Sequence, residues 1–257
     1  MGPASTAAPT AAPSPPPPGA LQGVALCALL LGGWALSLAP LLRPEPLQIA
    51  DLIWALPLVA LRTWLCTGVF ICAHDAMHGV LAPGRPRLND ALGATCAGLY
   101  AAFSFRALRV AHHLHHAAPA SSADPDWHDG AHPGPVRWFL AFQRRYLRWW
   151  QVAIIAVVFN IGQLGFGLAA LDLWLLVAAP ALLSSAQLFV FGTYLPHPDG
   201  PRPFADHHRA RCSGAPTWWS LLSCFHFGYH LAHHRFPFVP WWGLPAAERH
   251  LRAQGVG

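Results

Sequence analysis

Residues 52–78 read LIWALPLVALRTWLCTGVFICAHDAMH, an apolar run of membrane length that ends in two histidines, His74 and His78. Side chains four residues apart share one face of a helix. Clustered histidines beside apolar segments occur twice more, as HHLHH at 112–116 and as HLAHH at 230–234. The sequence therefore indicates apolar helices that bring imidazole groups together at one end.

The composition is typical of a membrane protein. Of the 257 residues 54% are hydrophobic and 11% charged, and the mean hydropathy is +0.35. So little charge cannot cover the surface of a soluble globule. We expect an all-α integral membrane protein with one domain over residues 20–250. Residues 1–19 are expected to be a disordered Pro/Ala-rich tail that is not a cleaved signal peptide, and residues 251–257 a C-terminal tail.

Four segments are long enough to cross a bilayer core of about 30 Å, which takes roughly 20 helical residues. Short polar connections join them into two helical hairpins. A further run, Ala91 to Phe105, is shorter, and we interpret it as a re-entrant or interfacial helix, with a buried helix as the alternative. The four expected spans are Ala20 to Leu42, Leu52 to Cys72, Val152 to Leu171 and Leu173 to Leu195.

Arginine placement predicts the orientation, because the chain contains no Lys. Most arginines lie between the hairpins or after the second one, and only Arg43 lies in an outer connection. The positive-inside rule then places both termini and a histidine-rich cap on the cytoplasmic side, which we expect to be that of a bacterial inner membrane. The basic pI of about 9.1 reflects this topology and anionic lipid headgroups, and we expect no nucleic-acid partner.

Two features inside the spans carry structural expectations. Arg62 lies mid-span, where a charge costs about 2.5–3.5 kcal/mol on insertion scales. It is expected to face the helix bundle near a polar partner such as Asn160, Gln163 or Gln187, or else to snorkel to an interface. The six cysteines form no C-x-x-C pair and predict free thiols.

The histidine clusters predict a centre with two metal ions. A lone His is usually a hydrogen-bonding residue, but three clusters, two of them sharing the pattern H-x-x-H-H, are a metal signature. Eight imidazoles are too many for one ion. Imidazole suits iron, copper and zinc alike. A substrate dissolved in lipid offers mainly C–H bonds, however, and their oxidation requires a redox metal with O₂.

The motifs HDxxH, HxxHH and HxxHH on two membrane hairpins resemble those of the membrane di-iron desaturase and hydroxylase superfamily. Within it, four segments are similar to signature segments of the beta-carotene 4-ketolase family. The resemblance covers about Leu52 to Pro245 and not the N-terminal tail. The segments are AHDAMHG (73–79), DPDWH (124–128), FGTYLPH (191–197) and FPFVPWWGLP (236–245).

This resemblance implies O₂-dependent oxidation of the C4 methylene of a beta-ionone ring to a ketone, by two hydroxylations and loss of water. Beta-carotene would give echinenone and then canthaxanthin, and zeaxanthin would give astaxanthin. The implied cofactors are two iron ions, with O₂ as co-substrate and an external electron donor such as ferredoxin. A carotenoid hydroxylase or a fatty acyl desaturase of the same superfamily is the nearer alternative. A non-enzymatic His-rich metal carrier is the more distant one.

The resemblance also implies the ligands. His113 fills an x position and is expected to point elsewhere. His197, at the end of the fourth expected span, is a ninth ligand or a cap of that helix. His226 is expected to orient a ligand, with a tenth ligand as the alternative. The nine expected iron ligands are His74, His78, His112, His115, His116, His197, His230, His233 and His234.

Carboxylates near the clusters are expected to accept the N–H of a ligating imidazole and fix its tautomer. Asp75, Asp124 and Asp126 are the candidates, together with His128, and a plain loop turn is the alternative for Asp124-Pro125-Asp126. The family commonly has Glu where this chain has Ala232. This departure would affect the level of activity rather than iron binding.

Aromatic and remaining histidine residues complete the expectations. Most tryptophans are expected at the membrane interfaces. Residues expected to contact the substrate are Phe103, Phe105, Phe189 and Tyr194, and residues expected at the surface are His132, His207, His208 and His250.

Overall fold

The computed structural model describes residues 19–128, 130, 134–197, 204 and 206–256. Within these residues the chain is helical, and its one β-type contact is an isolated bridge between Cys212 and Tyr229. The expected all-α fold class is confirmed. All but the last residue of the expected N-terminal tail lies outside the described part of the chain.

The helices follow one another along the chain with short connections. The α-helices are α1 (Ala20–Leu36), α2 (Leu52–Met77), α3 (Pro86–Ala101), α4 (Phe105–Ala117), α5 (Pro135–Tyr146), α6 (Trp149–Asn160), α7 (Ala170–Leu173), α8 (Ala179–Phe189), α9 (Thr217–Cys224), α10 (His230–Arg235) and α11 (Leu244–Ala253). Short 3-10 or π-helical segments are η1 (Ala39–Leu42), η2 (Ile49–Asp51), η3 (Ile161–Gly165), η4 (Trp174–Ala178), η5 (Val190–Tyr194) and η6 (Trp241–Gly243).

Three helical stretches of the described chain are long and apolar enough to cross a membrane: Ala20–Leu42, Ile49–Met77 and Ala170–Tyr194. They overlap the first, second and fourth expected spans. The count rises to five if two sharply bent helix pairs each form one span. These pairs are α3 with α4, bent by 97°, and α5 with the helix Trp149–Gly165, bent by 87°.

The bent pairs change two expectations. The third expected span, Val152 to Leu171, is not one straight helix: it ends at Gly165, passes through Gly167 at φ +68°, and resumes only at Ala170. A glycine with positive φ ends a helix at little steric cost. The run Ala91 to Phe105 forms most of α3 and the bend into α4, where Ala102 adopts a left-handed conformation, φ 54°.

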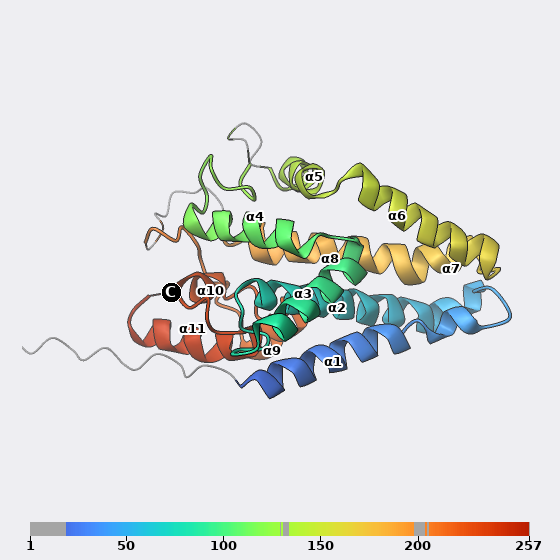
Figure 1. Cartoon of the computed structure of the whole chain (residues 1–257), viewed down its shortest axis with the longest axis horizontal. Helices are drawn as coiled ribbons and strands as arrows, with labels where there is room; N and C mark the ends of the chain where they lie inside the picture. Colours follow the sequence, from blue (N-terminus) through green and yellow to red (C-terminus); the bar gives the residue numbers. More distant parts are fainter. Residues whose placement is uncertain (1–18, 129, 131–133, 198–203, 205, 257) are drawn as a thin grey trace, which may run out of the picture.

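Helix α2 lies at the centre of the molecule. It packs against α1, α3 and α8, and its last turn points to the same end as α4 and α10 (Figure 1). Helix α6, segment η3 and helix α7 run toward the opposite end. The histidines of the three clusters are therefore gathered at one end of the bundle.

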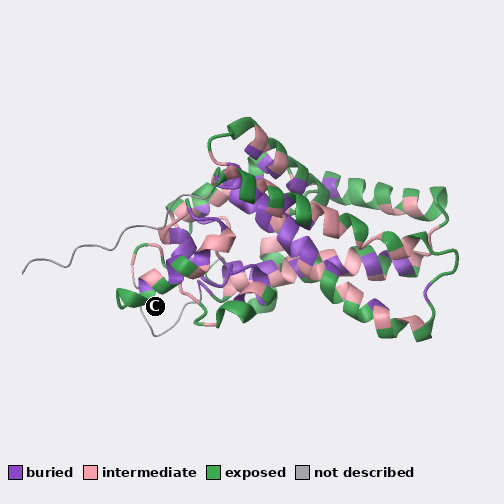
Figure 2. Ribbon diagram, turned by 90° about the horizontal axis from the view of Figure 1, so that it is seen from below, coloured by how far each residue is buried: buried purple, intermediate pink, exposed green. Residues whose placement is uncertain are grey.

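Buried residues are concentrated toward the histidine end of the bundle, and exposed residues are more frequent toward the opposite end. The second half of α2 and all of α10 up to His234 are buried, whereas long stretches of α1 and α6 are exposed (Figure 2). Many of the exposed side chains are large and apolar, such as Leu29 at 70% and Val158 at 62% exposure. Apolar exposure on this scale fits a protein whose solvent is lipid. The fold is that of a membrane protein.

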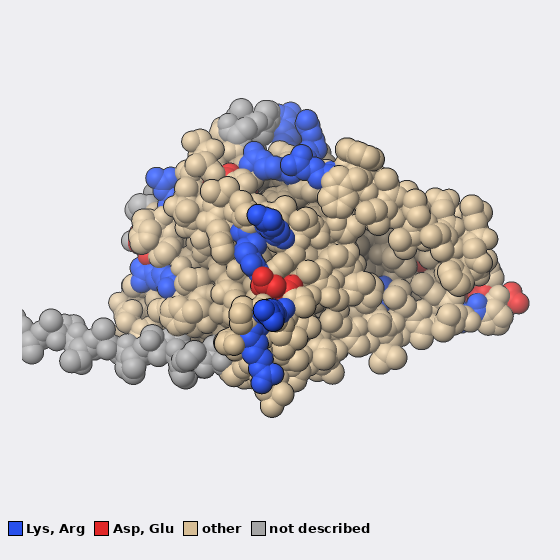
Figure 3. All heavy atoms as spheres, viewed as in Figure 1, with Lys and Arg blue, Asp and Glu red and all other residues tan. Residues whose placement is uncertain are grey.

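Arginines gather on the half of the surface that holds the histidine end, as the blue side chains of Figure 3 show. The other half of the face shown is almost free of charge, with Arg43 at its tip paired to Asp51 at 3.1 Å. The structure thus separates an apolar half from an arginine-rich half.

Arg62 faces the bundle and is 1% exposed. Its guanidinium donates to the carbonyl oxygens of Leu176 and Trp34 and to the Ser37 hydroxyl, which joins α1, α2 and η4. The expected side-chain partners were therefore wrong. Gln187, one of the expected partners, instead accepts a hydrogen bond from Thr67. Thr67 lies more than one helical turn after Arg62 along α2. The expectation of free thiols is confirmed for all six cysteines.

Two glycines of α3 offer a test of the packing. A Cβ atom at Gly93 would lie 2.5 Å from the Phe105 ring and 2.7 Å from the Ala76 Cβ atom, whereas one at Gly98 would meet nothing within 4 Å. We expect Gly93→Ala to lower the free energy of unfolding by about 1–3 kcal/mol, because the core is overpacked. Thermal unfolding in detergent, with Gly98→Ala as the control, measures this effect. Equal midpoints for both variants would contradict the close contact.

Candidate metal centre

Nine histidines from four segments converge at the buried end of the bundle. Helix α2 ends in His74 and His78, α4 and α10 carry the other two clusters, and His197 follows η5. Two groups of four each place one nitrogen per residue within 4.8 Å of the others. We name them site A, with His74, His78, His112 and His233, and site B, with His115, His197, His230 and His234.

The Nε2 atoms within each site point at one another. In site A those of His78 and His112 are 2.7 Å apart. In site B the Nε2 atom of His234 lies 3.1 Å from that of His115 and 3.0 Å from that of His230. His116 lies between the sites, because its Nε2 atom is 3.0 Å from that of His233 and its ring stacks on His234 at 4.1 Å.

These separations fit metal coordination. Neighbouring nitrogens bound to one ion at about 2.0–2.1 Å lie roughly 3 Å apart. In addition, the Nε2 atoms of His74 and His197 are buried without any hydrogen-bond partner. A buried polar atom without a partner is costly, and a cation at each site would satisfy these two. The donor set therefore fits two metal ions, and imidazole nitrogen is compatible with iron.

The sites favour neutral imidazole. Burial, together with the charges of neighbouring histidines, lowers the pKa of His78 and of His197 to about 3. Burial also holds the pKa of His230, His233 and His234 well below the usual value. A neutral imidazole has a lone pair available, so these residues are in the form that coordinates a metal.

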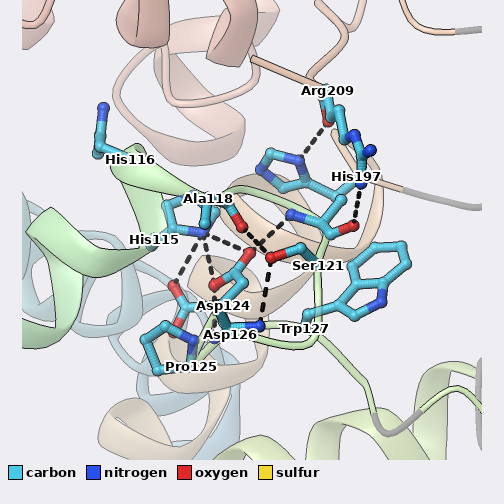
Figure 4. A network of polar contacts seen from close by, with 12 residues as sticks. His115, His116, Ala118, Ser121, Asp124, Pro125, Asp126, Trp127, His197 and Arg209 are labelled. Carbon is cyan, nitrogen blue, oxygen red and sulfur yellow. Dashed lines mark hydrogen bonds and ion pairs between the residues drawn. The ribbon is translucent and has the colours of Figure 1, made fainter. Parts of the chain in front are cut away.

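Carboxylates and a carbonyl orient the ligands of site B (Figure 4). The Nδ1 atom of His115 is 3.0 Å from both carboxylate oxygens of Asp124, and Asp126 lies 3.8 Å from the same nitrogen. His197 donates from Nδ1 to the carbonyl oxygen of Arg209 at 2.6 Å. Because Nδ1 is occupied, Nε2 of each ring is left for a metal.

Asp124 is itself held in place by the backbone. It accepts from the N–H of Ala120 and from that of Asp126, both at 2.8 Å. The second bond is a turn in which an Asp side chain bonds the backbone two residues on. Asp124 therefore forms the loop turn and, at the same time, contacts the His115 imidazole.

Site A has a matching arrangement. The Nδ1 atom of His74 is 3.2 Å from one carboxylate oxygen of Asp75, and the other oxygen accepts the backbone N–H of Trp241 at 3.0 Å. This contact explains why the FPFVPWWGLP segment lies near the first histidine cluster. Neither Trp241 nor Arg209 could be linked to a histidine from the sequence, since backbone contacts over such distances leave no residue-type signal.

Three other histidines near the clusters lie outside both sites. His113 turns its Nε2 atom toward the carbonyl oxygen of Met77, at 3.1 Å. His226 is buried and stacks on Tyr229 and Trp241. His128 stacks on Trp127 at 4.1 Å.

Ala232 is fully buried in an apolar cluster with side chains of α11, such as Leu251.

The histidines expected at the surface differ in their exposure. His207 is exposed, whereas His208 and His250 are half-buried. Asp206, His207 and His208 form a further possible metal-binding group, but the Asp206 carboxylate is already paired with Arg235 at 2.7 Å. His132 lies outside the described residues.

A cavity opens beside both sites. His74 and His112 of site A and His115 and His230 of site B form one part of its wall. The rest of the wall is mainly apolar and aromatic: Phe70, Met77, Tyr100, Phe103, Leu108, Asp126, Phe142, Gln143, Tyr146, Ser185, Leu188, Gly192, Thr193 and Phe227.

Of the four aromatic residues expected to contact the substrate, Phe103 lines this cavity. Phe105 instead packs at Gly93 on α3. Phe189 lies against Phe142, with ring centroids 5.6 Å apart, and Tyr194 contacts Trp138 and Phe189.

Five aromatic residues of the cavity wall were not predicted from the sequence. For α5 a signal was present, since Trp138, Phe142 and Tyr146 recur every four residues and mark one helix face. The missed residues are Phe70, Tyr100, Phe142, Tyr146 and Phe227.

Comparisons with known proteins show the family to which the chain belongs. The sequence model of the family "Fatty acid desaturase" matches residues 50–152 and 134–256. The chain is 47% identical to a beta-carotene ketolase of a Paracoccus species, over 72% of this chain and 76% of that protein. It is 43% identical to beta-carotene 4-ketolase 3 of Haematococcus lacustris, over 75% and 61%. It is 36% identical to the zeaxanthin 4-ketolase of Chlamydomonas reinhardtii, over 94% and 56%.

Buried histidine clusters on apolar helices, together with the family match, define the class: the chain is a membrane protein of the fatty acid desaturase superfamily. Within that superfamily it belongs to the beta-carotene ketolase family.

The ninth histidine can be tested by metal content. We expect His197→Ala to reduce bound iron to half or less of the wild-type amount, because site B loses a buried nitrogen that has no other partner. A helix cap would contribute only about 0.3–1 kcal/mol of stability and leave the metal in place. Iron per purified chain is compared with that of His250→Ala, a residue outside both sites. Equal iron in the two variants would remove His197 from site B.

A second test concerns the carboxylate behind His115. Loss of such an orienting partner weakens metal binding about 10- to 100-fold. We therefore expect Asp124→Asn to weaken Fe²⁺ binding by this factor, measured by competition with a chelator. The control is Asp90→Asn, which removes a carboxylate paired with Arg109 at the surface. An Fe²⁺ affinity as high as that of the control would show that Asp124 stabilises the loop and does not contribute to metal binding.

Proposed function

We propose that this protein is a non-haem di-iron oxygenase that oxidises the C4 methylene of carotenoid beta-ionone rings to a ketone. The observation that carries the proposal is the cavity: imidazoles of both sites form one side of it, and aromatic and aliphatic side chains form most of the rest. Carotenoid substrates are supported by the relatives, which are named beta-carotene and zeaxanthin ketolases. The products from beta-carotene would be echinenone and canthaxanthin.

The residues that would hold iron are the four histidines of site A, the four of site B, and His116 between them. When bound, two iron ions supply the reductive activation of O₂ that replaces a C–H bond with C–OH. The protein itself orients three of these imidazole rings. Asp75, Asp124 and the carbonyl of Arg209 each hold an Nδ1 atom, so that Nε2 remains directed inward.

The overall reaction requires external electrons. Each hydroxylation uses one O₂, two electrons and two protons, places one oxygen atom on C4 and releases the other as water. The second hydroxylation gives a geminal diol, which loses water to form the ketone. We propose a ferredoxin-type protein as the electron donor.

The cavity residues position the substrate and exclude water. Phe103 between α3 and α4, Phe142 on α5 and Phe227 beside site B provide apolar surface for a hydrocarbon ring. Contact with His112 and His115 brings the ring carbon next to the two sites. A dry wall protects a reactive centre from side reactions with water.

The membrane arrangement follows from the distribution of charge and apolar surface. We propose four spans in two hairpins, with the helix bends at α3/α4 and α5/α6 close to one membrane interface. The arginine-rich half would face the cytoplasm of a bacterium, next to its inner membrane (Figure 3). A carotenoid dissolved in the bilayer would then reach the cavity laterally.

Pigment analysis tests the function. We expect a bacterium that accumulates beta-carotene to form ketocarotenoids when it expresses this protein, visible as a red shift and as new chromatographic peaks. His115→Ala and His233→Ala should abolish ketone formation while leaving the protein in the membrane, and His250→Ala should not. Hydroxylated pigments without ketone would favour a carotenoid hydroxylase instead, and altered acyl chains a desaturase. Retained turnover in either ligand variant would contradict the metal assignment.

A further inference from the structure

One hydrogen-bonded pair interrupts the apolar wall of the cavity. Gln143 on α5 and Ser185 on α8 both line it, and the Ser185 hydroxyl donates to Oε1 of Gln143 at 2.9 Å. Neither residue belongs to site A or site B. The pair is therefore polar surface that metal binding does not require.

The neighbouring polar residues of α8 have structural roles. Ser184 contacts the hydroxyl groups of Thr67 and Tyr100, at 2.9 and 3.2 Å. Gln187 accepts from Thr67 and donates to the carbonyl oxygen of Ser223. These bonds join α8 to α2 and α3, and they leave no spare donor directed into the cavity.

Gln143 differs, because its amide has bonding capacity left over. Ser185 occupies one side of the amide, and among the described residues no acceptor lies within hydrogen-bond distance of its nitrogen. Whichever way the amide is turned, one polar group remains for a ligand. Gln143 is half-buried and its amide nitrogen is not among the buried atoms without a partner, so water or a ligand in the cavity can reach it.

The position of Gln143 relates it to the reacting centre. Gln143 lies one helical turn before Tyr146, whose hydroxyl donates to Asp126. Asp126 in turn lies 3.8 Å from Nδ1 of His115 in site B. The part of the wall that carries Gln143 is thus connected through Tyr146 and Asp126 to His115 of site B.

We propose that the Gln143 amide recognises an oxygen substituent on the ring, the hydroxyl at C3 next to the reacting carbon. This inference rests on the proposed function and names the residue by which the cavity would distinguish hydroxylated rings from unsubstituted ones. A hydroxyl buried against aromatic side chains without a hydrogen bond is disfavoured. Gln143 supplies that bond, and Ser185 fixes the direction of its amide.

The test compares two substrates in two variants. We expect Gln143→Leu to lower kcat/KM for zeaxanthin relative to beta-carotene by about tenfold, the usual effect of one lost hydrogen bond. Ser185→Ala breaks the same contact between α5 and α8 but keeps the amide. Its ratio of the two kcat/KM values should therefore stay within about threefold of the wild-type ratio. Gln143→Met, with a side chain of similar length, repeats the test if the Leu variant fails to accumulate.

The outcomes separate the inference from the proposed function. An equal fall for both substrates in Gln143→Leu and Ser185→Ala would mean that the pair only ties α5 to α8, and would overturn the inference. Release of a C4-hydroxylated intermediate from beta-carotene by Gln143→Leu would place the amide on the inserted oxygen, and would also overturn it. A wild-type protein that forms no ketone from either substrate would refute the proposed function itself.

Discussion

The structure depends on one constraint: nine imidazole rings lie close together, most of them buried, with ring nitrogens directed at one another. Burial lowers the pKa of His197 and favours its neutral form. A buried imidazole needs partners for both nitrogens. Within the described residues the protein supplies an Nδ1 partner for His74, His115 and His197, whereas the Nδ1 atoms of His230 and His234 have none. The Nε2 atoms are left to share what occupies the two sites.

The surrounding fold can be understood as support for that arrangement. Helix α2 holds His74 and Asp75 deep in the bundle, and the sharp bend between α3 and α4 turns α4 so that its histidines meet those of α2. Elsewhere in the bundle a glycine permits close packing: at Gly192 in η5, the absence of a side chain leaves room for the Phe227 ring. Loops far apart in the sequence then add the oxygen atoms of Asp124 and Arg209 behind the rings.

Local patterns were enough to predict the parts of the molecule that depend on neighbouring residues. Hydropathy located the central helix, and the spacing of His112, His115 and His116 indicated a shared helix face. Properties that depend on tertiary depth were not accessible: the partners of Arg62 are backbone carbonyls and a serine, and the helix of the third apolar run ends at Gly165, before the expected end of that span. Most of the cavity wall could not be predicted for the same reason, because its residues come from six α-helices, from η5 and from the loops between them.

Helices α4 and α10 each contribute to both sites. Helix α4 gives His112 to site A and His115 to site B, while α10 gives His233 to site A and His230 and His234 to site B. Ordering these two helices around a first ion therefore also brings most nitrogens of the second site together. The conformational entropy lost in the first binding step is not lost again in the second. The two ions should consequently load as a pair, with chains that carry a single ion scarce at intermediate metal concentrations.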